Sequence, residues 1–133
     1  MGRSLLRIAA ALAMAAAVAV GCASAPIATT SECPTWDGLG AVRVNPAGAP
    51  DRHLRLQAAF RICPPQEGLA EIERKRIELR HEVIRLLSGQ TVAQLEDPLR
   101  AEKLRQQLLI LVNERVLKKA RAVDVFITGM ELE

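Results

Sequence analysis

Three cysteines and two histidines are the side chains of this chain whose chemistry could go beyond packing and ion pairing. The cysteines are Cys22, Cys33 and Cys63, and the histidines are His53 and His81. None of them has the spacing of a metal site or of a nucleophile paired with a base. We therefore expect no metal, no cofactor and no catalytic residue, and the cysteines need another explanation.

Two further patterns also argue against an enzyme. Gly38-Leu39-Gly40 has no third glycine and no helix after it, so it does not predict a phosphate-binding loop. The carboxylates of the central segment recur with arginines at helical spacing, as solvated ion pairs on a helix face do. These residues are Glu71, Glu73, Glu78 and Glu82, with Arg74, Arg80 and Arg85. The sequence thus favours a non-enzymatic protein.

The first cysteine lies at the end of an export signal. Arg3 and Arg7 accompany the start of an uncharged apolar run over residues 8–21, which is the pattern of a secretory signal. The residues just before Cys22 are similar to the lipobox of bacterial lipoproteins, in which the cysteine is diacylated and becomes the mature N-terminus. We expect residues 1–21 to be removed and Cys22 to carry the lipid.

Two alternatives to lipid attachment stay open. No charge occurs over residues 8–31, so an uncleaved membrane anchor is one. Soluble secretion after cleavage at Ala23-Ser24-Ala25 is the other, although Pro26 would follow that cut. All three place the remaining chain outside the cytoplasm. With lipid on Cys22, the residue Ala23 favours sorting to the outer membrane, and the choice between the inner and outer membrane stays open.

Composition excludes a nucleic-acid-binding protein. The net charge is +3, but two basic residues lie in the signal, and from residue 22 onward 16 basic residues face 15 acidic ones. Only 2% of the residues are aromatic, too few for a surface on which bases stack. The length of 133 residues fits one domain.

The chain after Cys22 predicts a tether followed by a small α+β domain. Residues 22–37 are rich in Ala, Ser, Thr and Pro, which is typical of a tether. Apolar residues alternate over 54–62, so this strand is expected to pair with a strand over 39–44 as a hairpin. Beyond it, the pattern predicts a helix over 68–87 and then a short helix at Thr91.

The last third of the chain predicts a second long helix and a closing strand. Asp97 and Pro98 give a start signal for a helix over 98–117. A strand over 123–132 follows, with a bulge or bend at Gly129, where the apolar residues change parity. The predicted order is strand, strand, helix, short helix, helix, strand (β-β-α-α-α-β). Lys118, Lys119 and Arg121 suit the negative end of the helix dipole.

The middle of the second long helix is apolar on nearly every side. Leu104, Leu108, Leu111 and Val112 form its inward stripe. Leu109 and Val116 lie on one flank of the stripe, and Ile110 and Leu117 lie on the other. Because a domain this small cannot cover such a helix completely, we predict that these four residues form an interface with another subunit or a partner.

Two other features have roles outside catalysis. Arg76 and Arg80 project from the apolar face of the first helix, where they either pair with Glu73 or a sheet residue or contact a partner carboxylate. Cys33 and Cys63 form an even remainder once Cys22 is acylated, and they precede the first strand and end the second. Antiparallel pairing would place them within reach of a disulfide in an oxidising compartment.

From Gly38 to Glu133 the chain resembles the periplasmic domain of the flagellar basal-body protein family FliL. The resemblance rests on the order and spacing of several strings along the whole domain. They are the strands over 41–45 and 53–62, the helix end over 80–88, the connector SGQTVAQL over 88–95, the helix over 104–117 and the ending VFIT over 125–128. The predicted organisation is therefore a signal over 1–21, a lipid-anchored tether over 22–37 and a FliL-like periplasmic domain over 38–133.

The resemblance implies a stomatin-like fold, a self-associating ring around the flagellar stator and no catalytic site. The chain departs from the family in two ways. Family members are generally held by an inner-membrane helix, whereas this chain has a lipoprotein-like signal. Gly129 and Met130 also stand where members often have Glu and an aromatic residue. A structural or adaptor lipoprotein that uses the same domain with another envelope partner is the alternative function.

Overall fold

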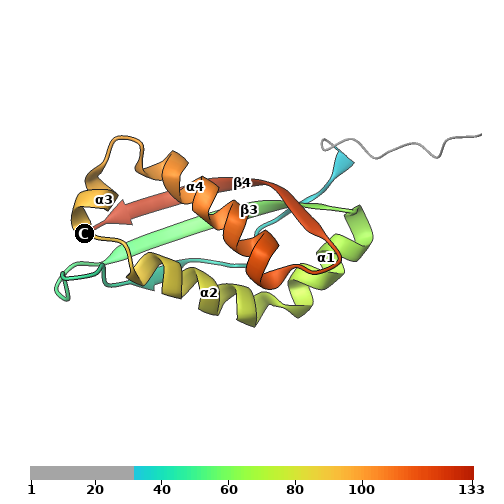
Figure 1. Ribbon diagram of the computed structural model, residues 1–133, viewed down its shortest axis with the longest axis horizontal. Coiled ribbons are helices and arrows are strands. Elements are labelled where there is room, and N and C mark those ends of the chain that lie inside the picture. Colours follow the sequence, from blue (N-terminus) through green and yellow to red (C-terminus); the bar gives the residue numbers. More distant parts are fainter. Residues whose placement is uncertain (1–31) are drawn as a thin grey trace, which may run out of the picture.

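The computed structural model describes residues 32–133 as an antiparallel sheet with helices packed on it (Figure 1). The elements are β1 (Thr35–Trp36), β2 (Val42–Val44), β3 (Leu54–Cys63), α1 (Pro65–Arg74), α2 (Arg76–Ser88), α3 (Val92–Glu96), α4 (Arg100–Leu111), the π-helical turn η2 (Val112–Val116) and β4 (Arg121–Leu132). The α+β class is confirmed. The order differs from the predicted one, because an extra strand β1 comes first, the first helix is divided into α1 and α2, and the π-helical turn η2 follows α4.

The long strand β3 is the centre of the sheet. Both β1 and β2 pair with one edge of it, and β4 pairs with the other edge along its whole length, all antiparallel. The predicted alternation is present, because Leu54, Leu56, Phe60 and Ile62 are fully buried beneath the helices. Their neighbours in the sequence point to the other face, where Arg55, Gln57 and Arg61 are half-buried and Ala59 is buried.

The strand β4 contains two bulges. Gln57 lies opposite Gly129, whereas the next residue, Ala58, lies opposite Ile127, so Thr128 is an extra residue in β4. The predicted irregularity at Gly129 is therefore confirmed. A second shift, near Ile62, leaves an extra residue close to the start of β4.

The first helix differs from its prediction because it is divided. The helix α1 begins at Pro65, where the missing N–H of proline costs no hydrogen bond, and it ends before Lys75. Gly68 allows α1 to approach β3, since a β-carbon there would lie 2.5 Å from the side chain of Ile62. The helix α2 then turns away along β2, as its contacts and Figure 1 show. The break lets Ile72 and Leu79 both enter the core.

The caps of the later helices follow the sequence closely. The predicted capping box is present, because Thr91 Oγ1 accepts the backbone N–H of Gln94 and the Gln94 side chain accepts the N–H of Thr91. The helix α4 begins at Arg100, two residues later than expected. Asp97 still satisfies its start by accepting the N–H of Leu99 at 2.8 Å.

The ordered domain begins earlier than residue 38. Within the predicted tether over 22–37, Cys33 is buried and Thr35–Trp36 form β1. The predicted signal over 1–21 and the lipid acceptor Cys22 lie outside the described residues. Among residues 32–133, no helix is long and apolar enough to cross a membrane.

Candidate partner-binding surface

The structure separates the four residues predicted to form an interface. Ile110 is 56% exposed and Leu109 is half-buried, as an interface requires. Val116 and Leu117 are buried in the core, so their assignment to an exposed flank is wrong. The reason is the π-helical turn η2, whose wider turn rotates Val116 inward, while Leu117 has already left the helix with an extended backbone.

The inward stripe of α4 also differs from its prediction at one position. Leu108 is fully buried, as expected. Leu111, expected beside it, is only half-buried and lies at the side of α4 that meets α2. Because 3.6 residues make a turn, positions three apart cannot both lie at the centre of a narrow stripe. Leu111 therefore belongs to the surface between the two helices.

A groove between α2 and α4 collects these apolar side chains. It has a volume of about 400 Å³ and is lined by Leu86, Ile110 and Leu111. Its polar lining consists of Glu82, Arg85, Gln107, Glu114 and Arg115. Two acids and two bases thus surround an apolar strip. This combination suits reversible association with another protein surface.

The two arginines of α2 are used within the domain. Arg76 lies 3.4 Å from Glu73, and Arg80 donates to the backbone carbonyls of Leu39 and Ala41 at 3.0 and 3.2 Å. The expected pairing with Glu73 is therefore confirmed for Arg76, whereas Arg80 binds the chain just before the sheet strand β2. Arg80 thereby holds α2 against the segment that precedes β2.

Three exposed apolar residues were not predicted from the sequence. Ile77 and Ile84 in α2 are 81% and 37% exposed. Leu99, just before α4, is 63% exposed. The break at Lys75 changes the direction of α2 and explains Ile77, since the face that α1 buries is not continued by α2.

A buried carboxylate fixes the chain between η2 and β4. Glu71, predicted to lie on a solvated helix face, is instead 3% exposed. Its oxygens accept the backbone N–H groups of Lys118 at 2.6 Å and of Lys119 at 3.1 Å, and Ala120 contributes a longer bond of 3.5 Å. Burial is the largest single effect on the pKa of Glu71, and it raises the pKa. The three backbone donors and nearby Lys75 together outweigh burial and hold the pKa below its usual value.

Lys75 completes this arrangement from the break between the two helices. Its ammonium group lies 3.9 Å from Glu71 and donates to the Val116 carbonyl at 3.0 Å. Lys75 therefore places a positive charge at the C-terminal end of α4 and η2. The backbone N–H groups of Lys118 and Lys119 bind Glu71 as well. The prediction that the side chains of Lys118, Lys119 and Arg121 suit the negative end of the helix dipole stays a prediction.

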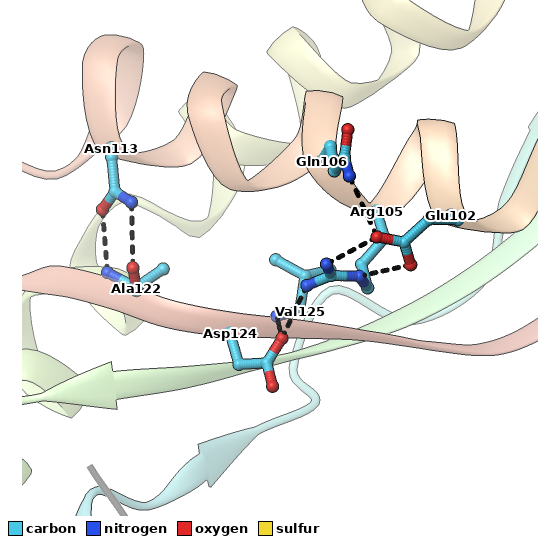
Figure 2. A network of polar contacts seen from close by, with 7 residues as sticks. All are labelled: Glu102, Arg105, Gln106, Asn113, Ala122, Asp124 and Val125. Carbon is cyan, nitrogen blue, oxygen red and sulfur yellow. Dashed lines mark hydrogen bonds and ion pairs between the residues drawn. The ribbon is translucent and has the colours of Figure 1, made fainter.

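A second polar network holds α4 against β4 (Figure 2). Arg105 donates to both oxygens of Glu102 and also to Asp124 Oδ1 at 2.9 Å. Hydrogen bonds from Arg105 and then Gln106 lower the pKa of Glu102 to about 2. In η2, two residues beyond the end of α4, Asn113 donates to the Ala122 carbonyl at 2.9 Å and accepts the Ala122 N–H at 2.8 Å.

The structure joins Cys33 and Cys63 in a disulfide whose Cα atoms lie 5.2 Å apart. The pairing follows from the register, because Thr35 lies opposite Arg61 and the two cysteines continue this antiparallel pair. The bond ties the start of the domain to the junction of β3 and α1. This is the pairing expected when Cys22 is set aside and two cysteines remain.

The histidines lie apart in the fold. His53 is exposed before β3, where its Nδ1 lies 3.2 Å from the side-chain nitrogen of Asn45. His81 is exposed on α2. Among residues 32–133, the structure contains no cluster of three or more histidine, cysteine or acidic side chains that could hold a metal.

Comparison with known protein families gives a match over most of the described domain. Residues 38–130 match the family described as flagellar basal body-associated protein FliL. No curated protein matches the chain. The matched range extends from just after β1 almost to the end of β4, so it covers the other three strands, the helices and the groove between α2 and α4. The chain therefore belongs to the FliL family, whose members are associated with the flagellar basal body.

Proposed function

We propose that this chain is a non-enzymatic accessory protein of the flagellar motor. In this proposal a membrane-anchored periplasmic domain associates with further copies of itself and supports the stator. The observation that carries the flagellar role is the family match over residues 38–130. A stomatin-like relationship, which the resemblance implies, would suit a ring assembled from such small α+β domains.

The groove between α2 and α4 is the surface that supports self-association best. Leu86, Ile110 and Leu111 supply apolar area that the domain itself does not cover. Its charged rim carries both signs, so one copy can offer acids where the next copy offers bases. Glu82 and Arg85 lie 3.4 Å apart, and the arginine side chain is 63% exposed. An exposed ion pair contributes little free energy, so breaking it on binding costs little.

The experiment compares two aspartate substitutions on the same helix. Ile110→Asp places a charge on the exposed side of α4 and is expected to leave the melting temperature nearly unchanged while reducing the mass measured by light scattering. Leu108→Asp buries an unpaired charge and is expected to unfold the domain. If Ile110→Asp assembles like the parent and restores swimming in a deletion strain, the groove is not the contact.

We further propose that Cys22 is the lipid acceptor and that residues 1–21 are removed. Cells expressing the parent chain are given a clickable fatty acid, and a Cys22→Ala chain should lose the label. Ser24→Ala, two residues away, is the matched control and should keep it. Equal labelling of the parent and Cys22→Ala would contradict lipid attachment at this cysteine.

An envelope adaptor outside the motor is the second candidate. Ala23 after the proposed lipid acceptor favours it, because this residue directs lipoproteins to the outer membrane, away from the stator. Deleting the gene separates the two candidates. A motor protein requires a loss of swimming speed with filaments intact, whereas an adaptor leaves swimming unchanged. Neighbouring genes for the stator or for flagellar export would favour the motor.

A further inference from the structure

The outer edge of β4 is covered along only one of its halves. All the ladder pairs of β4 are with β3, so its opposite edge faces away from the sheet. Edge strands of this length normally carry a feature that blocks pairing with another chain. Here such a feature is present at the beginning of β4 and stops midway.

The covered half belongs to the network in Figure 2. Asn113 reaches down from η2 and pairs with both backbone groups of Ala122, as a neighbouring strand would. Asp124 then accepts the backbone N–H of Val125 at 2.8 Å and is itself held by Arg105. These side chains occupy the backbone groups at which a further strand would otherwise pair.

The second half, from Phe126 to Leu132, has no such cover among the described residues. No strand or side chain of residues 32–133 hydrogen-bonds its outer backbone groups. Thr128 is the bulge residue within this half and is exposed. A stretch of backbone long enough to pair with an extended peptide is therefore open, directly after a stretch that is closed.

A crevice lies beside the open half. Its apolar lining is formed by Leu95, Met130 and Leu132, and its volume is about 370 Å³. Met130 and Leu132 lie two residues apart, so both side chains point from β4 toward the helices. A strand added at this edge would place every second side chain on the same face. Those side chains would meet the crevice.

The charged lining of the crevice is basic on balance. Arg52 and Arg100 flank it, with Glu96 as the opposing charge. Each guanidinium makes one backbone contact, Arg52 with the Glu133 carbonyl at 2.9 Å and Arg100 with the Asp97 carbonyl at 3.2 Å, and each carries further donors. Arg100 is the first residue of α4, where the helix dipole disfavours a cation, so helix stability does not account for it.

We propose that the outer edge of β4 from Phe126 to Leu132 binds an extended acidic segment of a partner protein as an additional strand. The backbone of β4 supplies the hydrogen bonds, the crevice receives an apolar side chain and the two arginines receive a carboxylate. This surface is distinct from the groove between α2 and α4, so one domain can contact a neighbour and a partner together. Loss of self-association would leave this binding intact.

The test uses the full chain and two fluorescein-labelled peptides, one of alternating Val and Glu and one of alternating Val and Lys. Fluorescence polarisation should show binding of the Val/Glu peptide alone. Arg100→Glu should weaken it by about tenfold, equivalent to 1.4 kcal/mol. Arg74→Glu, an exposed arginine on α1, is the matched control and should change it less than about twofold.

A second variant tests the backbone contact. Thr128→Pro removes an N–H from the bulge, where no ladder pair with β3 is lost, and should abolish binding at an unchanged melting temperature. Amide exchange of residues 126–132 in the parent should slow when the Val/Glu peptide is added. This measurement needs no variant, so it decides the case if Thr128→Pro fails to fold.

Four results would overturn the proposal. They are no binding of the Val/Glu peptide at about 1 mM, equal binding of the Val/Lys peptide, equal affinity of Arg100→Glu and the parent, and slowed exchange at the groove between α2 and α4 instead of at β4. If light scattering gives a smaller mass for Arg100→Glu than for the parent, the edge of β4 binds a second copy of this chain and not a partner protein. Edge protection that disappears when residues 1–31 are removed would assign it to the chain's own N-terminal segment.

Discussion

Removing the carboxylate of Glu71 should destabilise the domain more than removing any exposed acid on its helices. The substitution Glu71→Ala leaves the backbone N–H groups of Lys118 and Lys119 without their acceptor in a buried setting. It also leaves Lys75 without its counter-charge, although its bond to the Val116 carbonyl is retained. The link between α1 and the start of β4 is then lost.

The magnitude follows from the two short hydrogen bonds. A hydrogen bond to a charged group contributes about 1.5–3 kcal/mol, and the third contact, at 3.5 Å to Ala120, is too long to count fully. Breaking a buried pair by removing one partner typically costs about 3–5 kcal/mol, which agrees with the sum of two bonds. Because a domain of this size is stable by only about 5–15 kcal/mol, the variant should lose a large share of its free energy of unfolding.

Urea unfolding followed by tryptophan fluorescence measures this loss. Trp36 is the only tryptophan of the chain, is 8% exposed and donates to Glu73 at 2.8 Å, so its emission should change when the domain unfolds. The matched control is Glu67→Ala, an exposed acid in the first turn of α1, which should cost less than about 1 kcal/mol. If both variants unfold at the same urea concentration, the carboxylate does not hold the loop and our reasoning is refuted.

Three further outcomes are expected. The pKa of Glu71 is lowered from 4.5, so its contribution is present above that pH and is lost as the pH falls through the folded value; Glu71→Gln should flatten this acid limb in urea titrations. Replacing Cys33 and Cys63 with Ser opens a loop with a sequence separation of 30 and should cost about 3–4 kcal/mol, whereas alkylation of two free thiols in the unreduced parent would exclude the bond. Asn113→Ala should cost about 1–3 kcal/mol by calorimetry, and an unchanged melting temperature would show that water replaces the amide at Ala122.

The elements that depend on local pattern were predictable from the sequence. The alternation in β3, the capping box at Thr91 and the parity change at Gly129 all have a cause within a few residues, and the structure has each of them. The disulfide was also within reach, because two strand ends set the pairing of Cys33 with Cys63. In these segments the conformation that the local sequence prefers is also the conformation in the fold. Such agreement is expected of a sequence that folds to a single structure.

The features that depend on distant contacts were not predictable. Glu71 has the same helical spacing to arginines as the solvated acids around it, and only the loop 47 residues away shows that it is buried. The π-helical turn leaves no signature in the apolar period, so Val116 and Leu117 were assigned to the wrong surface. The strand β1 is two residues long, which is too short for any periodicity to indicate.

If Cys22 carries a lipid as proposed, the disulfide sets the end of the domain at which the anchor enters. β1 and Cys33 lie at the end of β3 that meets α1, whereas the crevice beside Leu132 lies at the other end, near the C-terminus marked in Figure 1. Ten residues of β3 at about 3.4 Å each separate the two ends by roughly 30 Å. Residues 23–32 between a lipid on Cys22 and the disulfide reach at most about 35 Å when fully extended. A lipid on Cys22 would thus attach the domain at its β1 end, opposite the crevice beside β4. Because the reach of residues 23–32 is as great as the length of β3, the domain could still turn, so the anchor alone would not set the distance of the open edge from the membrane.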